Sequence, residues 1–241
     1  GLGGYNANFK RFSNYVKDRE ETKGLAKAAY SAYRERSVGL GTMGFHAFLQ
    51  SKALPFNGLQ STSTNHVMFS YIKERAVEAT KRLAEERGEA PDIHGSSHRN
   101  AHLLAIAPNA SSSIICGGTS PSIEPYRANV YTHKTLSGSY QVRNRYLDRL
   151  LKKKGLKVEE REKVWKDISG TNGSVQHLDI LDDSEKEIFK TAPEINQIYL
   201  VEHAHMRQQY VCQSQSVNLF FTMLKATASQ EVHDDYLQYV N

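Results

Sequence analysis

The chain has 241 residues, of which 39% are hydrophobic, enough to bury a sizeable core. Its formal net charge of +5 is too modest to indicate nucleic-acid binding by itself. No apolar run approaches the ~18 residues of a membrane span, and no cationic segment precedes an apolar one at the start, so we expect a cytoplasmic protein without membrane association. Cys116 and Cys212 are far apart and form no CxxC pair, so both are expected to be buried or free thiols.

In chain order, the first half is predicted to contain three helices and one strand. Residues 24–36 and 45–53 have helical composition, and residues 64–87 form a longer helix with apolar residues at helical spacing. The run HLLAIA, residues 102–107, is short, almost wholly apolar and followed by Pro108. That pattern is typical of a strand buried on both faces.

The second half continues this alternation. Further strands are predicted at residues 128–135 and in the region of residues 212–221. Helices that alternate with well-spaced buried strands indicate an α/β fold. The helices predicted here are residues 144–154, 184–192, 194–207 and 229–240.

Two patterns suggest ligand sites but have simpler interpretations. Residues 39–44, GLGTMG, match GxGxxG, yet the preceding segment reads as charged helix rather than buried strand, and no acid occurs between Glu35 and Glu74 to bind a ribose hydroxyl. We interpret these glycines as a turn that lets a helix pack closely. The densest basic segment, residues 143–155, reads as a helix with an apolar stripe and a solvated cationic face, so nucleic-acid binding is not expected.

The histidines do not predict a metal site. His94, His98 and His102 are spaced by four, but a glycine and two serines interrupt the helix that would align them. His203 and His205 are two residues apart and would diverge on a helix. All five are expected to be structural or surface histidines.

The stretch PNASSS, residues 108–113, places three serines directly after the predicted strand. Pro108 ends the strand, and the following residues can begin a short helix whose first N–H groups lack intrahelical partners. Such N–H groups suit a phosphate when small side chains allow it to approach. There is no GxxxxGK[ST] sequence and no lysine in the turn, so the donors would be neutral. An ordinary serine-capped turn and an anion site both fit this pattern.

Three segments in the right order carry a family resemblance. They are RERSVGLGTMGFHAFLQ, PNASSSIICGGTSPSIEPYRANVYTHKTLSGSYQVRN and QSQSVNLFF. Together they closely resemble the C-terminal part of the large catalytic (alpha) subunit of class I ribonucleoside-diphosphate reductase, in the form seen in large DNA phages. The similarity covers about residues 24–221.

The resemblance implies a fold and a binding site. Residues 24–241 would form the C-terminal part of a ten-stranded α/β barrel, and residues 1–23 would be a divergent N-terminal segment. In this family the serine-rich turn holds the substrate's diphosphate. Carried over residue by residue, the substrate-binding positions are Pro108, Asn109, Ala110, Ser111 and Ser112, with Ser113 adjacent. Asn109 stands where other members often have Ser or Thr.

The resemblance also implies that this chain holds no catalytic residue and no metal or other cofactor. The family's radical cysteine lies in an Asn-x-Cys-x-Glu motif that is absent here, and its redox-active cysteine pair has no counterpart, so Cys116 and Cys212 are expected to be structural. The implied partners are the N-terminal portion of the large subunit, a small (beta) subunit with a diiron-tyrosyl radical, a ribonucleoside diphosphate, and thioredoxin or glutaredoxin as reductant. If phage-encoded, the protein would act in the host cytoplasm.

Two hypotheses about function follow. In the first, the chain is a portion of a reductase large subunit that binds the substrate diphosphate and is active only with a chain that carries the radical cysteine. In the alternative, it is a non-catalytic nucleotide-binding or regulatory module derived from the reductase. Nucleic-acid binding through residues 143–154 would show a steep salt dependence and is the least favoured hypothesis.

Overall fold

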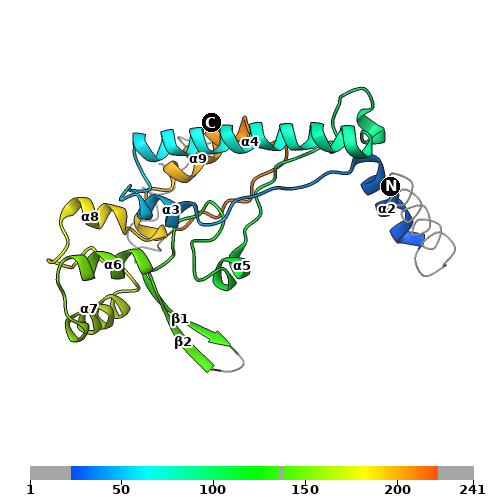
Figure 1. Ribbon diagram of the computed structural model, residues 1–241. Coiled ribbons are helices and arrows are strands. Elements are labelled where there is room, and N and C mark those ends of the chain that lie inside the picture. The colour runs from blue at the N-terminus through cyan, green and yellow to red at the C-terminus, as the bar shows by residue number, and fades with distance from the viewer. Residues whose placement is uncertain (1–22, 136–137, 222–241) are drawn as a thin grey trace, which may run out of the picture.

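The computed structural model describes residues 23–135 and 138–221, arranged as helices around three extended segments (Figure 1). The long helix α4 (Leu59–Arg87) runs along one side, and α2 (Lys23–Glu35) lies beyond its C-terminal end. A two-stranded hairpin projects on the other side. The helix predicted at residues 229–240 lies outside the described residues.

The three extended segments lie side by side. Residues 102–107 form the middle segment, the residues around Leu40 form the first, and the residues around Gln215 form the C-terminal one. Isolated parallel bridges join Leu104 to Leu40 on one side and Ile106 to Gln215 on the other. Leu104 and Ile106 are buried, as predicted for a strand covered on both faces. The strands predicted at residues 102–107 and 212–221 are thus present only as extended segments joined by single bridges, not as continuous strands.

The thiol of Cys212 is one reason why the pairing is short. Its Sγ accepts hydrogen bonds from the N–H groups of Leu103 at 3.0 Å and Leu104 at 3.3 Å, so these donors do not enter a regular ladder of carbonyl acceptors. Burial acts to raise the pKa of this thiol, but the two N–H groups and the charge of Lys73 outweigh it, and the pKa falls below its ordinary value. Cys212 is free and exposed, so of the two expected states, a buried or a free thiol, it has the second.

The glycines of residues 39–44 allow close approach of backbone segments. A Cβ atom on Gly41 would lie 2.8 Å from a carbonyl oxygen of the middle segment, and one on Gly44 would lie 2.6 Å from the hydroxyl oxygen of Thr119. Gly44 has a φ of 84° and directly precedes α3 (Phe45–Ser51). The predicted glycine turn is therefore found at Gly44, whereas Gly41 packs an extended segment against its neighbour.

The other helices surround these segments. They are α5 (Ala110–Ile115), α6 (Arg145–Lys153), α7 (Val158–Gly170), α8 (Asp183–Ile188) and α9 (Ile198–Gln208), with 3-10 turns η2 (Pro91–Ile93) and η3 (Ala192–Glu194). The six helices predicted within the described residues are present with shifted ends. Helix α7 is not predicted, because its sequence is mostly charged, yet its Trp165 and Ile168 are fully buried. No helix in the described ranges is long and apolar enough to span a membrane.

The projecting hairpin consists of β1 (Val130–Thr135) and β2 (Gly138–Arg143). The strands are antiparallel, with Val130 opposite Arg143 and Thr135 opposite Gly138. The strand predicted at residues 128–135 is thus confirmed. Its partner is not predicted, and most of the hairpin is exposed rather than buried as expected for these strands.

A hydrophobic cluster at the base of the hairpin joins α6, α7 and α8. Its central side chains are Leu147, Leu151, Trp165 and Ile168, all fully buried. Leu147 and Leu151 belong to the apolar stripe predicted for the basic helix. On its outer face, Lys152 pairs with Asp148 at 2.6 Å, which is consistent with a solvated charged surface.

Arg207 on α9 connects three elements from a buried position. Its Nη1 donates to Asn65 Oδ1 on α4 at 3.0 Å, and its Nε donates to Gln215 Oε1 at 3.1 Å. The guanidinium lies over the rings of Phe45 and Phe69, 5.9 and 5.4 Å from their centroids. Burial lowers the pKa of Arg207 to about 9. These contacts fix the extended segment around Gln215 against both helices.

Gly173 offers a test of the packing below the hairpin. Its φ is 83°, and a Cβ atom there would lie 2.4 Å from the Cβ of Ala128. Gly155 has a similar φ of 88° but no atom within 4 Å of the same position. We expect Gly155→Ala to destabilise by about 1 kcal/mol, the cost of a left-handed residue. Gly173→Ala should cost at least about 2 kcal/mol more, because backbone and side chain must move apart. Urea unfolding measures both, and equal losses would contradict the packing described here.

Candidate functional site

The predicted serine turn lies where the middle extended segment ends and α5 begins (Figure 1). Asn109 directly precedes α5 and adopts a left-handed conformation with φ 51° and ψ 27°. Asparagine adopts this conformation more readily than most residues. Its side-chain Nδ2 donates to the Thr42 carbonyl oxygen at 3.3 Å, which ties the turn to the neighbouring glycine-rich segment.

The first N–H groups of α5 point out of the helix without partners. The N–H groups of Ala110, Ser111 and Ser112 make no hydrogen bond to any described residue, and all three residues are exposed. Ser113 differs because its N–H donates to the Asn109 carbonyl oxygen at 2.9 Å and its hydroxyl donates to the Ala110 carbonyl oxygen at 2.7 Å. Ser113 is buried and its bonds shape the turn, whereas the N–H groups of its three predecessors have no partner among the described residues.

A cavity of about 360 Å³ adjoins this turn. The turn contributes Pro108, Ala110 and Ser113 to its lining, and the loop before β1 contributes Glu124 and Arg127. The Arg127 guanidinium lies over the ring of Phe220, 5.2 Å from its centroid, and is exposed. The cavity therefore brings neutral main-chain donors and a cation to one place.

Glu124, a residue of the cavity wall, binds Asn218 of the C-terminal extended segment. It is buried, and its Oε1 accepts hydrogen bonds from the main-chain N–H of Asn218 at 3.0 Å and from its Nδ2 at 2.7 Å. A carboxylate that accepts two N–H bonds in a buried position is firmly oriented. Two of the three segments of the sequence resemblance, residues 108–144 and 213–221, thus meet at this cavity.

His46 binds a residue of the cavity wall, Tyr126. Its Nδ1 accepts a hydrogen bond from the Tyr126 N–H at 3.0 Å. Burial lowers the pKa of His46 to about 3, against a weaker opposing effect of the Ile188 carbonyl, so the ring is neutral. Burial also raises the pKa of Tyr126 to about 12, and its hydroxyl donates to the Gly118 carbonyl oxygen at 3.3 Å. Both rings therefore act as neutral structural groups.

The remaining predicted residues lie apart from this site or have other roles. Cys116 directly follows α5 and is free and exposed, so of the two expected states it too has that of a free thiol. His94, His98 and His102 have different neighbours: Glu89, the Ser96 carbonyl oxygen and the Ser37 hydroxyl. His203 is buried and His205 is exposed, so these two diverge as predicted. In the described part of the chain, no three His, Cys, Asp or Glu side chains are placed to hold a metal ion.

Sequence analysis misses most of the cavity lining, including its two charged residues, Glu124 and Arg127, and Asn218. All three occur in the segments that carry the family resemblance. The sequence signal that could have identified Glu124 and Arg127 is that these two charged residues stand among apolar residues in IEPYR, close to the serine turn. Only the fold shows that Asn218 joins that pair, because about ninety residues separate it from Glu124 along the chain.

Comparison with known proteins establishes the family. A match to the family described as "Ribonucleotide reductase, barrel domain" covers residues 10–99 and 92–239. The chain therefore belongs to the ribonucleotide reductase barrel-domain family. This confirms the predicted fold class, the C-terminal part of an α/β barrel, although the division between residues 1–23 and 24–241 stays a prediction.

Individual relatives narrow the class to large subunits. The ribonucleoside-diphosphate reductase large subunit of Invertebrate iridescent virus 3 is 48% identical over 197 residues, which are 82% of this chain and 31% of that protein. The putative large subunit of Frog virus 3 (isolate Goorha) is 48% identical over 201 residues, covering 83% of this chain and 35% of that protein. This chain thus spans about a third of the length of these curated relatives. Both are viral, and the predicted phage form stays a prediction.

A solved structure agrees with this assignment. The Actinobacillus ureae class Id ribonucleotide reductase alpha subunit matches with a TM-score of 0.79 and 36% sequence identity. The match covers 94% of this chain and 41% of that one. The predicted resemblance to a class I large subunit is therefore confirmed.

The two buried histidines predict how stability responds to acid. Burial lowers the pKa of His203 to about 4, with a smaller contribution from Arg207, and the pKa of His46 is about 3. The unfolded chain takes up protons below pH ~6.5 while the folded chain does not, so stability is complete above that pH and falls toward pH 4. Each histidine should cost about 2 kcal/mol at pH 5.

The variant His203→Phe removes one of these titrations and keeps the stacking on Phe56, whose centroid lies 5.1 Å away. Its free energy of unfolding should fall less than that of the wild type between pH 7.5 and 5. The exposed neighbour is the control, and His205→Gln should retain the wild-type pH dependence. If His203→Phe also retains it, the buried imidazole does not titrate as described.

Proposed function

We propose that this chain forms part of the catalytic barrel of a ribonucleoside-diphosphate reductase and binds the diphosphate of its substrate at the start of α5. The observation that carries the proposal is the set of unpartnered N–H groups of Ala110, Ser111 and Ser112, of which Ala110 also lines the cavity. Phosphate oxygens accept such hydrogen bonds well, and the first turn of a helix adds a favourable partial charge. The substrate-binding residues would be 108–113, with Ser113 shaping the turn.

Arg127 would supply the positive charge that the serine turn lacks. It shares the cavity with the turn, and in the described residues it forms no ion pair with a carboxylate. Its stacking on Phe220 holds the guanidinium while leaving N–H groups for a phosphate. The neutral turn would then orient the diphosphate, and Arg127 would offset part of its charge.

The contribution of this chain to reduction would be positioning. Fixing the diphosphate places the ribose at a defined distance from the reacting groups, and such placement lowers the barrier by several kcal/mol in favourable cases. The radical cysteine would come from the N-terminal portion of the large subunit. The radical itself would originate in a small subunit with a diiron-tyrosyl centre, and thioredoxin or glutaredoxin would restore the reduced state. We expect this assembly to act in the cytoplasm.

Mixing the chain with a polypeptide that carries the radical cysteine, together with the small subunit and reductant, tests the activity. Reduction of CDP should require every component. Tight CDP binding by this chain alone, without reduction in a well-formed complex, would favour the non-catalytic nucleotide-binding module instead.

Variants of Asn109 test the binding geometry. Asn109→Gly and Asn109→Val both remove the side-chain bond to Thr42, but only valine resists the left-handed conformation that aims the N–H groups. We expect CDP affinity within about threefold of wild type for Asn109→Gly and at least about tenfold weaker for Asn109→Val. Calorimetry on the assembled enzyme measures both. Equal affinities for the two variants would show that this turn does not hold the diphosphate.

The charge of Arg127 is tested with a matched arginine. Arg149 is also exposed and lies over an aromatic ring, that of Tyr146, at 5.7 Å. Arg127→Gln should weaken CDP binding about tenfold, because one charge-assisted contact is lost. Arg149→Gln should leave binding within about twofold, since an exposed distant charge is screened by salt. An unchanged affinity in Arg127→Gln would remove this residue from the site.

A further inference from the structure

A second cavity, of about 280 Å³, lies at the C-terminal end of α4, beside α2. It is close to the lower end of the ~300–1,000 Å³ typical of small-molecule sites. Its polar lining includes Tyr33 and Arg36 from the end of α2, Arg87 from the last turn of α4, and Arg99 and Asn100 from the loop that follows. Three arginines therefore surround one small cavity.

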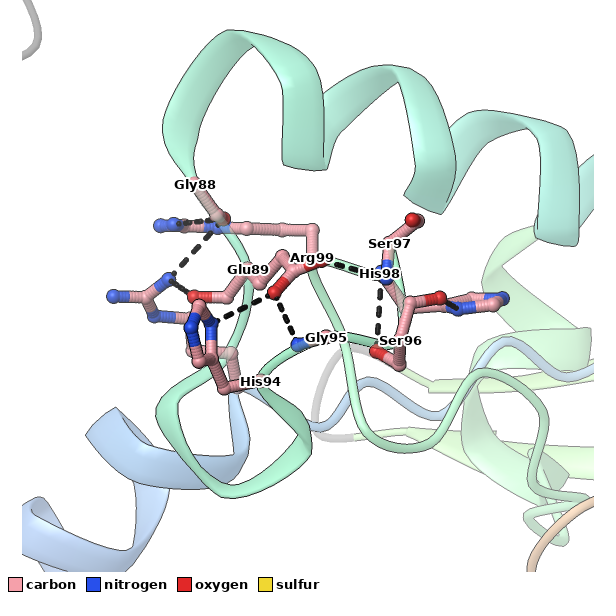
Figure 2. A network of polar contacts seen from close by, with 9 residues as sticks. Gly88, Glu89, His94, Gly95, Ser96, Ser97, His98 and Arg99 are labelled. Atoms are coloured by element: carbon pink, nitrogen blue, oxygen red, sulfur yellow. Dashed lines mark hydrogen bonds and ion pairs between the residues drawn. The ribbon is translucent and has the colours of Figure 1, made fainter.

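Two of these arginines converge on the same main-chain oxygen. Arg36 Nη1 donates to the Gly88 carbonyl oxygen at 3.4 Å and to that of Glu89 at 2.7 Å. Arg99 Nη1 donates to the Gly88 carbonyl oxygen at 3.0 Å and to that of Arg87 at 2.6 Å. Figure 2 shows the Arg99 guanidinium extending to Gly88 at the helix end. These bonds satisfy carbonyl groups that α4 leaves without partners.

The helix end does not balance this positive charge. A helix C-terminus carries the equivalent of about half a negative charge, which is less than the combined charge of Arg36 and Arg87. In the described part of the chain, Arg36 and Arg87 form no ion pair with a carboxylate. Like charges gathered at a partly buried place repel one another unless an anion lies between them.

Three of the neighbouring carboxylates have other partners. Glu89 accepts hydrogen bonds from the N–H groups of Gly95 and Ser97, both at 2.6 Å, which hold its pKa below the ordinary value (Figure 2). Asp92 pairs with Arg34. Glu35 accepts hydrogen bonds from the hydroxyls of Ser31 and Ser37, at 2.9 and 3.3 Å.

From this arrangement we infer that the cavity at the end of α4 binds a phosphate-bearing anion between Arg36, Arg87 and Arg99. The guanidinium group suits this ligand because its planar N–H donors match phosphate oxygens. Arg36 is held in place for the task, since it lies over the Tyr33 ring at 5.1 Å and its carbonyl oxygen accepts a bond from Asn100 Nδ2 at 2.7 Å. The site is separate from the serine turn and does not depend on the function proposed for it.

Titration of pyrophosphate into the ¹⁵N-labelled full chain, followed by NMR, tests the inference. The Gly88 amide and the Asn100 side-chain amide should shift along one saturating curve. Arg87→Gln should weaken this association about tenfold, because it removes a charge-assisted contact. The Arg87 side chain is exposed and forms no hydrogen bond or ion pair to the described residues, so its replacement should leave the fold intact. Adding Arg36→Gln should weaken binding further, and lysine at both positions should restore part of it.

Arg82→Gln is the matched control, because Arg82 is an exposed arginine of α4 outside the cavity lining. It should change the dissociation constant by no more than about twofold, the effect of a screened distant charge. A parallel titration with ATP distinguishes the source of the anion: equal affinity identifies a free phosphoanion, and tighter binding identifies a nucleotide. Absence of a saturating shift at Gly88 and Asn100, or equal weakening by Arg82→Gln and Arg87→Gln, would overturn the inference.

Discussion

Residues 102–107 form backbone hydrogen bonds with the extended segment around Leu40 on one side and with that around Gln215 on the other. The position of the candidate substrate site depends on these bonds. The Ala105 N–H donates to the Leu40 carbonyl oxygen at 3.1 Å, and the Ile106 N–H donates to that of Ser214 at 3.1 Å. The segment also buries its apolar side chains beneath α4. Pro108 follows directly, so the position of the serine turn is set by these bonds. In α/β folds, ligands bind beyond the carboxyl ends of the strands, and this turn occupies such a place.

The two phosphate-binding regions that we propose use opposite physical means. At α5, main-chain N–H groups face a cavity with one nearby arginine, so direction matters more than charge. At the end of α4, carbonyl groups occupy the helix terminus, and only side-chain cations can attract an anion there. The first arrangement recognises the shape of a diphosphate, whereas the second responds mainly to its charge and therefore to ionic strength.

Much of this structure could be predicted from the sequence, but not how distant segments meet. Helical spacing located the helix around Leu147 and Leu151, and an apolar run ending at Pro108 located the central segment. Helix α7 escaped prediction because tertiary burial of Trp165 stabilises a sequence rich in charge. Likewise, local composition predicts the serine turn, but it does not predict which residues from other segments lie beside that turn. Glu124 and Asn218 are joined only by folding, and no periodicity links them.

The outer side of the first extended segment bears on how this chain behaves when purified alone. Leu40 uses its N–H and carbonyl groups on the middle segment, whereas the N–H groups of Gly39 and Gly41 have no partner among the described residues. Val38 and Leu40 remain 48% and 50% exposed. An open, apolar edge of this kind is a template for adding another strand, so self-association at high concentration should begin there. A charged residue at Val38 would oppose this self-association and keep the isolated chain in solution. The same charge would also hinder the binding of any strand that completes the sheet at this edge.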